Sequence, residues 1–234
     1  MPALYTEILL KPLFNLLVFL YTAIPGRDLG VTILVLTLIV RILLYPLNRR
    51  AITSQRSIQR LQPEMEALKE KHKDDREKLA QEMMALYKRE KINPLSSCLP
   101  IVVQLPILIA VYQVFTAGIK SDAFQLLYPG IANPGTINTI AFGFLDLAAR
   151  SWPLAILAGI AQYWQTRMLM GSKSAATSSV SAMNKQMLYI MPVMTVFIGS
   201  RFPAGLALYW FATTVFTGLQ QLLMFKKSEK KQGS

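Results

Sequence analysis

The sequence is poor in the residues that build disulfide frameworks, metal sites and most catalytic centres. It has a single cysteine, Cys98, and a single histidine, His72, among 234 residues. One cysteine excludes an internal disulfide and a multi-cysteine zinc site. His72 lies in a charged stretch, where it is expected to be solvated. No catalytic motif, metal site or cofactor-binding loop is found, so we expect no enzyme, no metal and no cofactor.

Charged residues are also scarce, at 16% of the chain, whereas soluble domains carry ~25%. The chain is 53% hydrophobic, and its apolar residues gather in long runs that approach the ~20 residues needed to cross a bilayer. No acidic residue lies inside the apolar part of any run, which excludes a carboxylate proton relay. The sequence therefore predicts an all-α membrane protein with transmembrane helices at residues 28–47, 95–118, 152–170, 187–200 and 206–225.

The N-terminal segment, residues 1–27, is apolar but interrupted by Glu7, Lys11, Pro12 and Asn15. This pattern favours an amphipathic helix that lies in the membrane interface. A sixth transmembrane helix is the alternative. No basic region precedes the apolar core, so no cleavable signal peptide is expected.

Residues 48–94 are highly charged and predict a helical hairpin outside the bilayer. Apolar residues recur at alternating steps of three and four, the spacing of a coiled-coil seam; they are Ile58, Leu61, Met65 and Leu68, then Leu79, Met83 and Leu86. Asp74 and Asp75 suit a turn and a helix N-cap, and Pro63 should kink the first arm or begin a new helix. The hairpin is either an ordinary solvated structure or a contact surface for a partner or lipid headgroups.

The basic residues are distributed unequally between the two sides of the membrane. The hairpin carries a net charge of +4, and the tail, residues 226–234, carries +3. Arg167 and the two lysines of the loop at residues 171–186 add +3 on the same side, whereas the loop at 119–151 is neutral and the turn at 201–205 is +1. The positive-inside rule then predicts an outside N-terminus and a cytoplasmic C-terminus. The same distribution explains the net charge of +12 without nucleic acid.

Several polar or amphipathic side chains fall inside the predicted transmembrane helices. They are Thr37, Arg41, Gln104, Gln162, Gln165, Tyr209 and Trp210. Polar groups at this depth must face each other, water or a ligand. Simpler alternatives exist: Arg41 can reach the inner interface by snorkelling, the glutamines can join helices, and the aromatic pair can be plain packing.

Six motifs in order resemble the YidC/Oxa1/Alb3 membrane protein insertases, in particular their short bacterial-type members. They are VRILLYPL at 40–47, LQPE at 61–64, QEMMALYK at 81–88, NP at 93–94 with CLP at 98–100, QLPI at 104–107 and PAGLALYW at 203–210. The resemblance implies five transmembrane helices around a hydrophilic groove, with a cytoplasmic helical hairpin; the N-terminal interfacial helix is expected from the residues themselves.

The resemblance also implies the function of a membrane protein insertase and chaperone in the bacterial inner membrane. Such a protein receives hydrophilic segments of client proteins in a cationic groove and releases their transmembrane helices into the lipid bilayer. The groove residues of the family correspond to Arg41, Thr37, Gln104, Tyr209 and Trp210 of this sequence. The implied partners are client membrane proteins and the lipid bilayer, with the ribosome, the signal recognition machinery and the Sec translocon as further candidates. The alternatives are a small solute channel or transporter, or a membrane-protein assembly scaffold.

Overall fold

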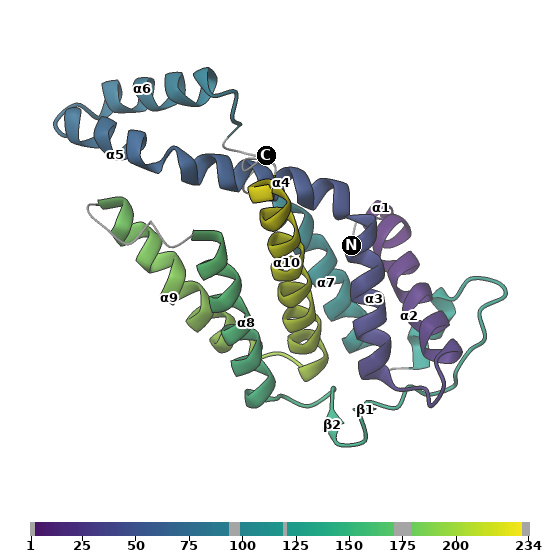
Figure 1. Cartoon of the computed structure of the whole chain (residues 1–234). Helices are drawn as coiled ribbons and strands as arrows, with labels where there is room; N and C mark the ends of the chain where they lie inside the picture. Colours follow the sequence, from purple (N-terminus) through teal and green to yellow (C-terminus); the bar gives the residue numbers. More distant parts are fainter. Residues whose placement is uncertain (1–2, 94–98, 119–120, 171–178, 231–234) are drawn as a thin grey trace.

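The described chain is mostly helical, as the long apolar runs predict (Figure 1). The computed structural model describes residues 3–93, 99–118, 121–170 and 179–230. The helices are α1 (Ala3–Tyr5), the π-helical turn η1 (Thr6–Leu10), α2 (Lys11–Ala23), α3 (Leu29–Leu43), α4 (Tyr45–Arg60), α5 (Gln62–Lys71), α6 (Arg76–Arg89), α7 (Leu99–Gly118), the 3₁₀ turn η3 (Ser121–Leu126), α8 (Trp152–Met170), α9 (Ser179–Gly199) and α10 (Ala204–Lys230). Two short antiparallel strands, β1 (Ile140–Ala141) and β2 (Leu145–Asp146), interrupt the loop before α8.

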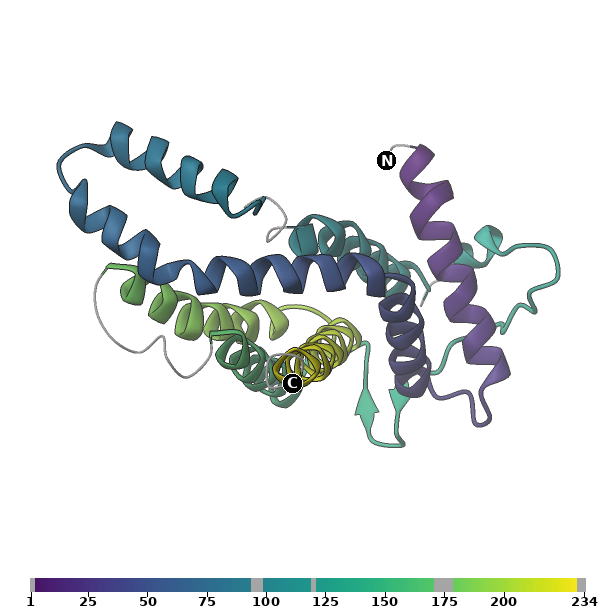
Figure 2. The same ribbon diagram turned by 45° about the horizontal axis from the view of Figure 1, so that its top comes forward.

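Helices α3, α7, α8, α9 and α10 correspond to the five predicted transmembrane helices and form one bundle (Figures 1 and 2). Helix α10 contacts the other four, and α8 packs closely on α9. Glycines permit these close approaches, because a Cβ on Gly159 would lie 2.4 Å from Val196, and one on Gly218 would lie 2.3 Å from the Trp164 ring. Small residues at helix contacts are typical of membrane bundles.

The first predicted span, 28–47, divides into two helices. Helix α3 begins at Leu29 and ends at Leu43, and its N-cap Asp28 accepts a 3.0 Å hydrogen bond from the Val31 amide. The chain then bends by 70° into α4. Pro46 lies in the first turn of α4, where its missing N–H leaves no hydrogen bond unmade. The last apolar residues of the run therefore belong to α4, which crosses one end of the bundle (Figure 2).

The hairpin has the predicted break and most of the predicted seam, without Ile58 and Leu79. Leu61, Met65 and Leu86 are buried in one cluster, with Leu68 and Met83 packed against it. Helix α4 ends at Arg60 and α5 begins at Gln62 with a proline in its first turn, which confirms the role expected of Pro63.

The turn of the hairpin gives one confirmation and one correction. Asp75 caps α6, accepting a hydrogen bond of 2.9 Å from the Lys78 amide, as predicted. His72, expected to be solvated, is instead only 8% exposed. It stands at the C-terminal end of α5, where its amide donates to the Leu68 carbonyl before the chain turns back. Sequence charge around His72 could not show that this turn would cover the ring.

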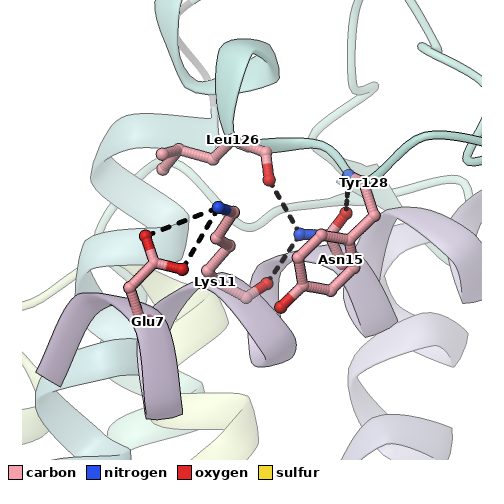
Figure 3. Close-up of polar contacts among 5 residues, drawn as sticks. All are labelled: Glu7, Lys11, Asn15, Leu126 and Tyr128. Atoms are coloured by element: carbon pink, nitrogen blue, oxygen red, sulfur yellow. Dashed lines mark hydrogen bonds and ion pairs between the residues drawn. The ribbon is translucent and has the colours of Figure 1, made fainter. Parts of the chain in front are cut away.

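The N-terminal helix lies against α3 and α7, and Asn15 joins it to the chain that follows α7 (Figure 3). The Asn15 side chain is 2% exposed. Its amide nitrogen donates to the carbonyls of Lys11 (2.8 Å) and Leu126 (2.9 Å), and its oxygen accepts from the Tyr128 amide (2.6 Å). Lys11 forms an ion pair with Glu7 at 3.2 Å. Asn15, one of the polar residues that interrupt this apolar segment, thus holds the helix in place.

Few of these helices are both long enough and apolar enough to be identified as transmembrane helices from those two properties alone. Among the residues with described side chains, residues 6–23 form the one helix that is long and apolar enough alone, and α3 passes only together with α4 as a bent pair. The number of transmembrane helices therefore stays a prediction. So does the choice between an interfacial and a spanning position for the N-terminal helix.

Candidate functional site

Three side chains from different helices meet at Arg41, a cation inside the predicted span 28–47. Arg41, in the last turn of α3, donates from Nη2 to Oε1 of Gln104 on α7 at 3.3 Å. Gln104 in turn donates from Nε2 to the hydroxyl of Tyr209 on α10 at 2.9 Å. Among the described residues no carboxylate forms an ion pair with Arg41. The guanidinium is thus positioned by a neutral amide and keeps its charge for another partner.

Arg41 lies at the wall of a cavity of about 300 Å³ between α3, α4, α7, α8 and α10. The polar groups of this cavity are amides and hydroxyls, and the rest are apolar. Its lining residues are Arg41, Leu44, Asn48, Ile52, Gln55, Gln104, Leu105, Leu108, Gln162, Gln165, Trp210, Thr213, Thr214, Thr217 and Gln221. A single cation and no carboxylate among these residues give the cavity a positive charge, which suits an anionic or polar ligand.

Two deeply buried amides in this cavity are only partly satisfied. Asn48 is 7% exposed and Gln221 is 1% exposed. The Nδ2 of Asn48 and the Oε1 of Gln221 have no hydrogen-bond partner among the described residues. A buried polar atom without a partner costs ~1–3 kcal/mol. These two atoms therefore favour a bound polar molecule, either water or a segment of polypeptide.

The structure brings together four of the five residues predicted for the groove. Arg41, Gln104 and Trp210 line the cavity, and Tyr209 is bonded to Gln104 from behind, with 2% of its surface exposed. Thr37 does not join them. Its hydroxyl donates to the Ile33 carbonyl of its own helix at 2.6 Å, and the side chain is 1% exposed.

Sequence reasoning missed the polar stripe that α10 contributes below Trp210. Counted from Trp210, these residues lie three, four, seven and eleven positions further along, so they share one face of the helix; they are Thr213, Thr214, Thr217 and Gln221. Asn48 and Gln55 on α4 were assigned to the hairpin, although they too line the cavity. The signal that could have found the α10 stripe is helical spacing of hydroxyl and amide residues within an otherwise apolar segment.

Comparison with known proteins identifies the family. The model of the 60Kd inner membrane protein family matches residues 19–231 of the chain. The chain belongs to this family. "Membrane protein insertase YidC" of Tolumonas auensis is 34% identical over 229 residues, and that of Vibrio cholerae (strain M66-2) is 36% identical over 224 residues. These relatives are named as insertases rather than as enzymes.

The similarity covers most of this chain but a smaller part of its relatives. It includes 97% of this chain and 38% of the Tolumonas protein, and 94% and 37% for the Vibrio protein. The chain thus spans a little over a third of the length of these family members. A crystal structure described as an active YidC insertase with the first transmembrane domain resolved superimposes with a TM-score of 0.65 at 25% identity, covering 92% of this chain and 45% of that one.

Proposed function

We propose that this chain is a membrane protein insertase of the bacterial inner membrane, with the cavity around Arg41 as its client-binding groove. The observation that carries the proposal is the Arg41–Gln104–Tyr209 chain, which holds an unpaired cation in a cavity of amides and hydroxyls. A polar segment of a client protein would move from bulk water into this cavity. The apolar helix of the client would then move into the lipid bilayer, which the hydrophobic effect favours.

Arg41, Gln104, Tyr209 and Trp210 are the residues we assign to this groove. Thr37, the fifth residue predicted for it, bonds the Ile33 carbonyl of its own helix and is left out of the assignment. Low-dielectric walls strengthen the pull of a cation on an acidic client segment. The action is physical, with no covalent step and no cofactor.

The proposed orientation places the hairpin and the C-terminus in the cytoplasm, where clients arrive. The hairpin extends away from the bundle beyond α4 (Figures 1 and 2). It is therefore the natural contact surface for clients, and for a ribosome, the signal recognition machinery or the Sec translocon when these deliver them.

Insertion in liposomes tests the role of Arg41. The full chain is reconstituted, and a client with zero, one or two acidic residues in its translocated tail is supplied. We expect Arg41→Ala to reduce insertion more with each acidic residue, whereas Arg41→Lys keeps most of the activity because the charge is retained. The measurement is the protease-protected fraction of the client.

Three results would contradict the proposal. A loss with Arg41→Ala that does not grow with the acidic count would leave Arg41 as a snorkelling or structural residue. Flux of small solutes through the liposomes without client insertion would instead identify a channel or transporter. Stable capture of a client that is never inserted would identify an assembly scaffold.

A further inference from the structure

Helix α4 has a second polar face, opposite the groove. Asn48 and Ile52 line the client cavity, whereas Arg49, Arg50 and Thr53 line a separate open cleft of about 710 Å³. The other wall of this cleft is the chain after α6, residues 91–93, which contributes the third cation, Lys91. The two clefts therefore lie on different sides of one helix.

The cleft is strongly positive because nothing described neutralises its three cations. Neither Arg49, Arg50 nor Lys91 forms an ion pair with a carboxylate of the described residues. Helix α4 contains no aspartate or glutamate. Glu90, the acid next to Lys91 in sequence, accepts instead from Arg89 at 3.1 Å.

The hydroxyl groups of the cleft are already used as donors. Ser54 on α4 donates to the Asn93 carbonyl at 3.3 Å, and this hydrogen bond joins the two walls of the cleft. Thr53 and Ser57 donate to carbonyls within α4 at 2.9 and 3.1 Å. An anion bound here would therefore be attracted by the cations, whereas the hydroxyl groups only line the cleft.

The position of the cleft indicates which anion it meets. Ile42 and Leu43, in the last turn of α3, are 63% and 71% exposed and present an apolar surface directly before the cleft. Tyr45, 47% exposed, stands between this surface and the arginines. Because α4 leaves α3 at 70°, a spanning α3 would direct α4 along the membrane surface at the level of the headgroups.

We propose that the cleft of Arg49, Arg50 and Lys91 binds the phosphate of an anionic phospholipid, whose acyl chains lie along Ile42 and Leu43. Basic pockets at the cytoplasmic ends of transmembrane helices are suited to such headgroups. A free phosphate would contact the cations but not the apolar surface of Ile42 and Leu43, and RNA would not bind that surface either. The site is distinct from the client groove and does not depend on insertase activity.

Lipid binding to the purified full chain in detergent tests the proposal. The probes are dioleoylphosphatidylglycerol, dioleoylphosphatidylcholine and, as a free phosphate, glycerol 3-phosphate. Affinity is measured by native mass spectrometry and by the shift of the thermal unfolding midpoint. We expect the wild type to prefer phosphatidylglycerol, with a loss of about fivefold in affinity for each cation replaced.

The variant Arg49→Gln/Arg50→Gln/Lys91→Gln removes the site, and Arg60→Gln/Arg76→Gln/Lys78→Gln is the control with the same change in charge at exposed positions. The control should keep the preference for phosphatidylglycerol, and the cleft variant should lose it. Single Arg49→Gln and Arg50→Gln variants, each with a partial loss, give the answer if the triple variant does not fold.

Three outcomes would overturn the proposal. One is equal binding of both lipids by the wild type. The second is an equal loss in the cleft and control variants, which would indicate general charge. The third is glycerol 3-phosphate binding as tightly as the lipid, which would assign the cleft to free phosphate.

Discussion

At the scale of single residues, the central feature is a neutral amide between a cation and a phenol. Gln104 accepts from Arg41 and donates to Tyr209, so one side chain positions both. A carboxylate at this position would neutralise the guanidinium, whereas an amide leaves its charge available. Oriented but unneutralised charge is what an electrostatic receiver of acidic segments requires.

We expect Gln104→Leu to reduce insertion, most strongly for clients with acidic segments. Arg41 loses its acceptor and can turn toward the headgroups. Two hydrogen bonds of ~0.5–1.5 kcal/mol each correspond to a loss of roughly fivefold to a hundredfold. Tyr209→Phe is the matched control, because it removes only the second bond and should cost less. Wild-type insertion rates in Gln104→Leu liposomes would show that the bridge has no role.

At the scale of elements, the N-terminal helix depends on one buried side chain. Asn15 satisfies two backbone groups of the segment after α7, at Leu126 and Tyr128 (Figure 3). No apolar residue could replace it, since buried backbone groups need partners.

Replacing Asn15 by Leu should therefore destabilise the fold by about 2–5 kcal/mol, because the Leu126 carbonyl and the Tyr128 amide lose their partner. The control is Phe19→Leu on the exposed face of the same helix, where 54% of the side chain is accessible. Thermal unfolding in detergent measures the difference. Equal midpoints for the two variants would show that water replaces the amide without cost.

The hairpin is the element that depends least on the bundle. Its seam is small, and its surface ion pairs, such as Arg89 with Glu64, are exposed and contribute little to stability. The hydrogen bonds from Arg89 to Glu90 and Glu64 raise the pKa of its guanidinium.

We expect deletion of residues 56–91, with a short linker, to leave the bundle folded but to slow insertion. The reason is that the hairpin has its own apolar cluster, while its position beyond α4 suits early contact with clients. Thermal unfolding and the liposome assay separate the two effects. Normal insertion after the deletion would show that the hairpin is not needed for client contact.

At the scale of the whole molecule, the charge distribution predicts the orientation in the membrane. Cysteine labelling with a membrane-impermeant reagent tests it in a Cys98→Ser background. Asn133→Cys should react from outside, because its loop carries no net charge. Asp75→Cys, at the tip of the hairpin, should react only after the membrane is opened. The reverse pattern would invert the orientation and place the groove on the other side.

The sequence by itself determined the features that depend on residues close together along the chain, such as helix caps, helix breaks and the spacing of apolar residues. The seam of Leu61, Met65 and Leu86, the Asp75 cap and the break at Pro63 all follow from spacing or backbone chemistry within one or two turns. Helix α8 begins at Trp152 and ends at Met170, as its apolar run predicts.

Only the tertiary structure decided which faces meet. Nearly every face of a membrane helix is apolar, so the pattern within one helix does not reveal its neighbour. Helix α9 likewise begins at Ser179 rather than at residue 187, because a helix can continue past the end of its apolar run. The 70° bend after Leu43 brings Asn48 to the cavity, and the packing of α10 brings Gln221 there, whereas Thr37 turns to its own backbone. The motifs identify the family, but packing across helices assembles the cavity around Arg41, because contacts distant in sequence leave no periodicity to read.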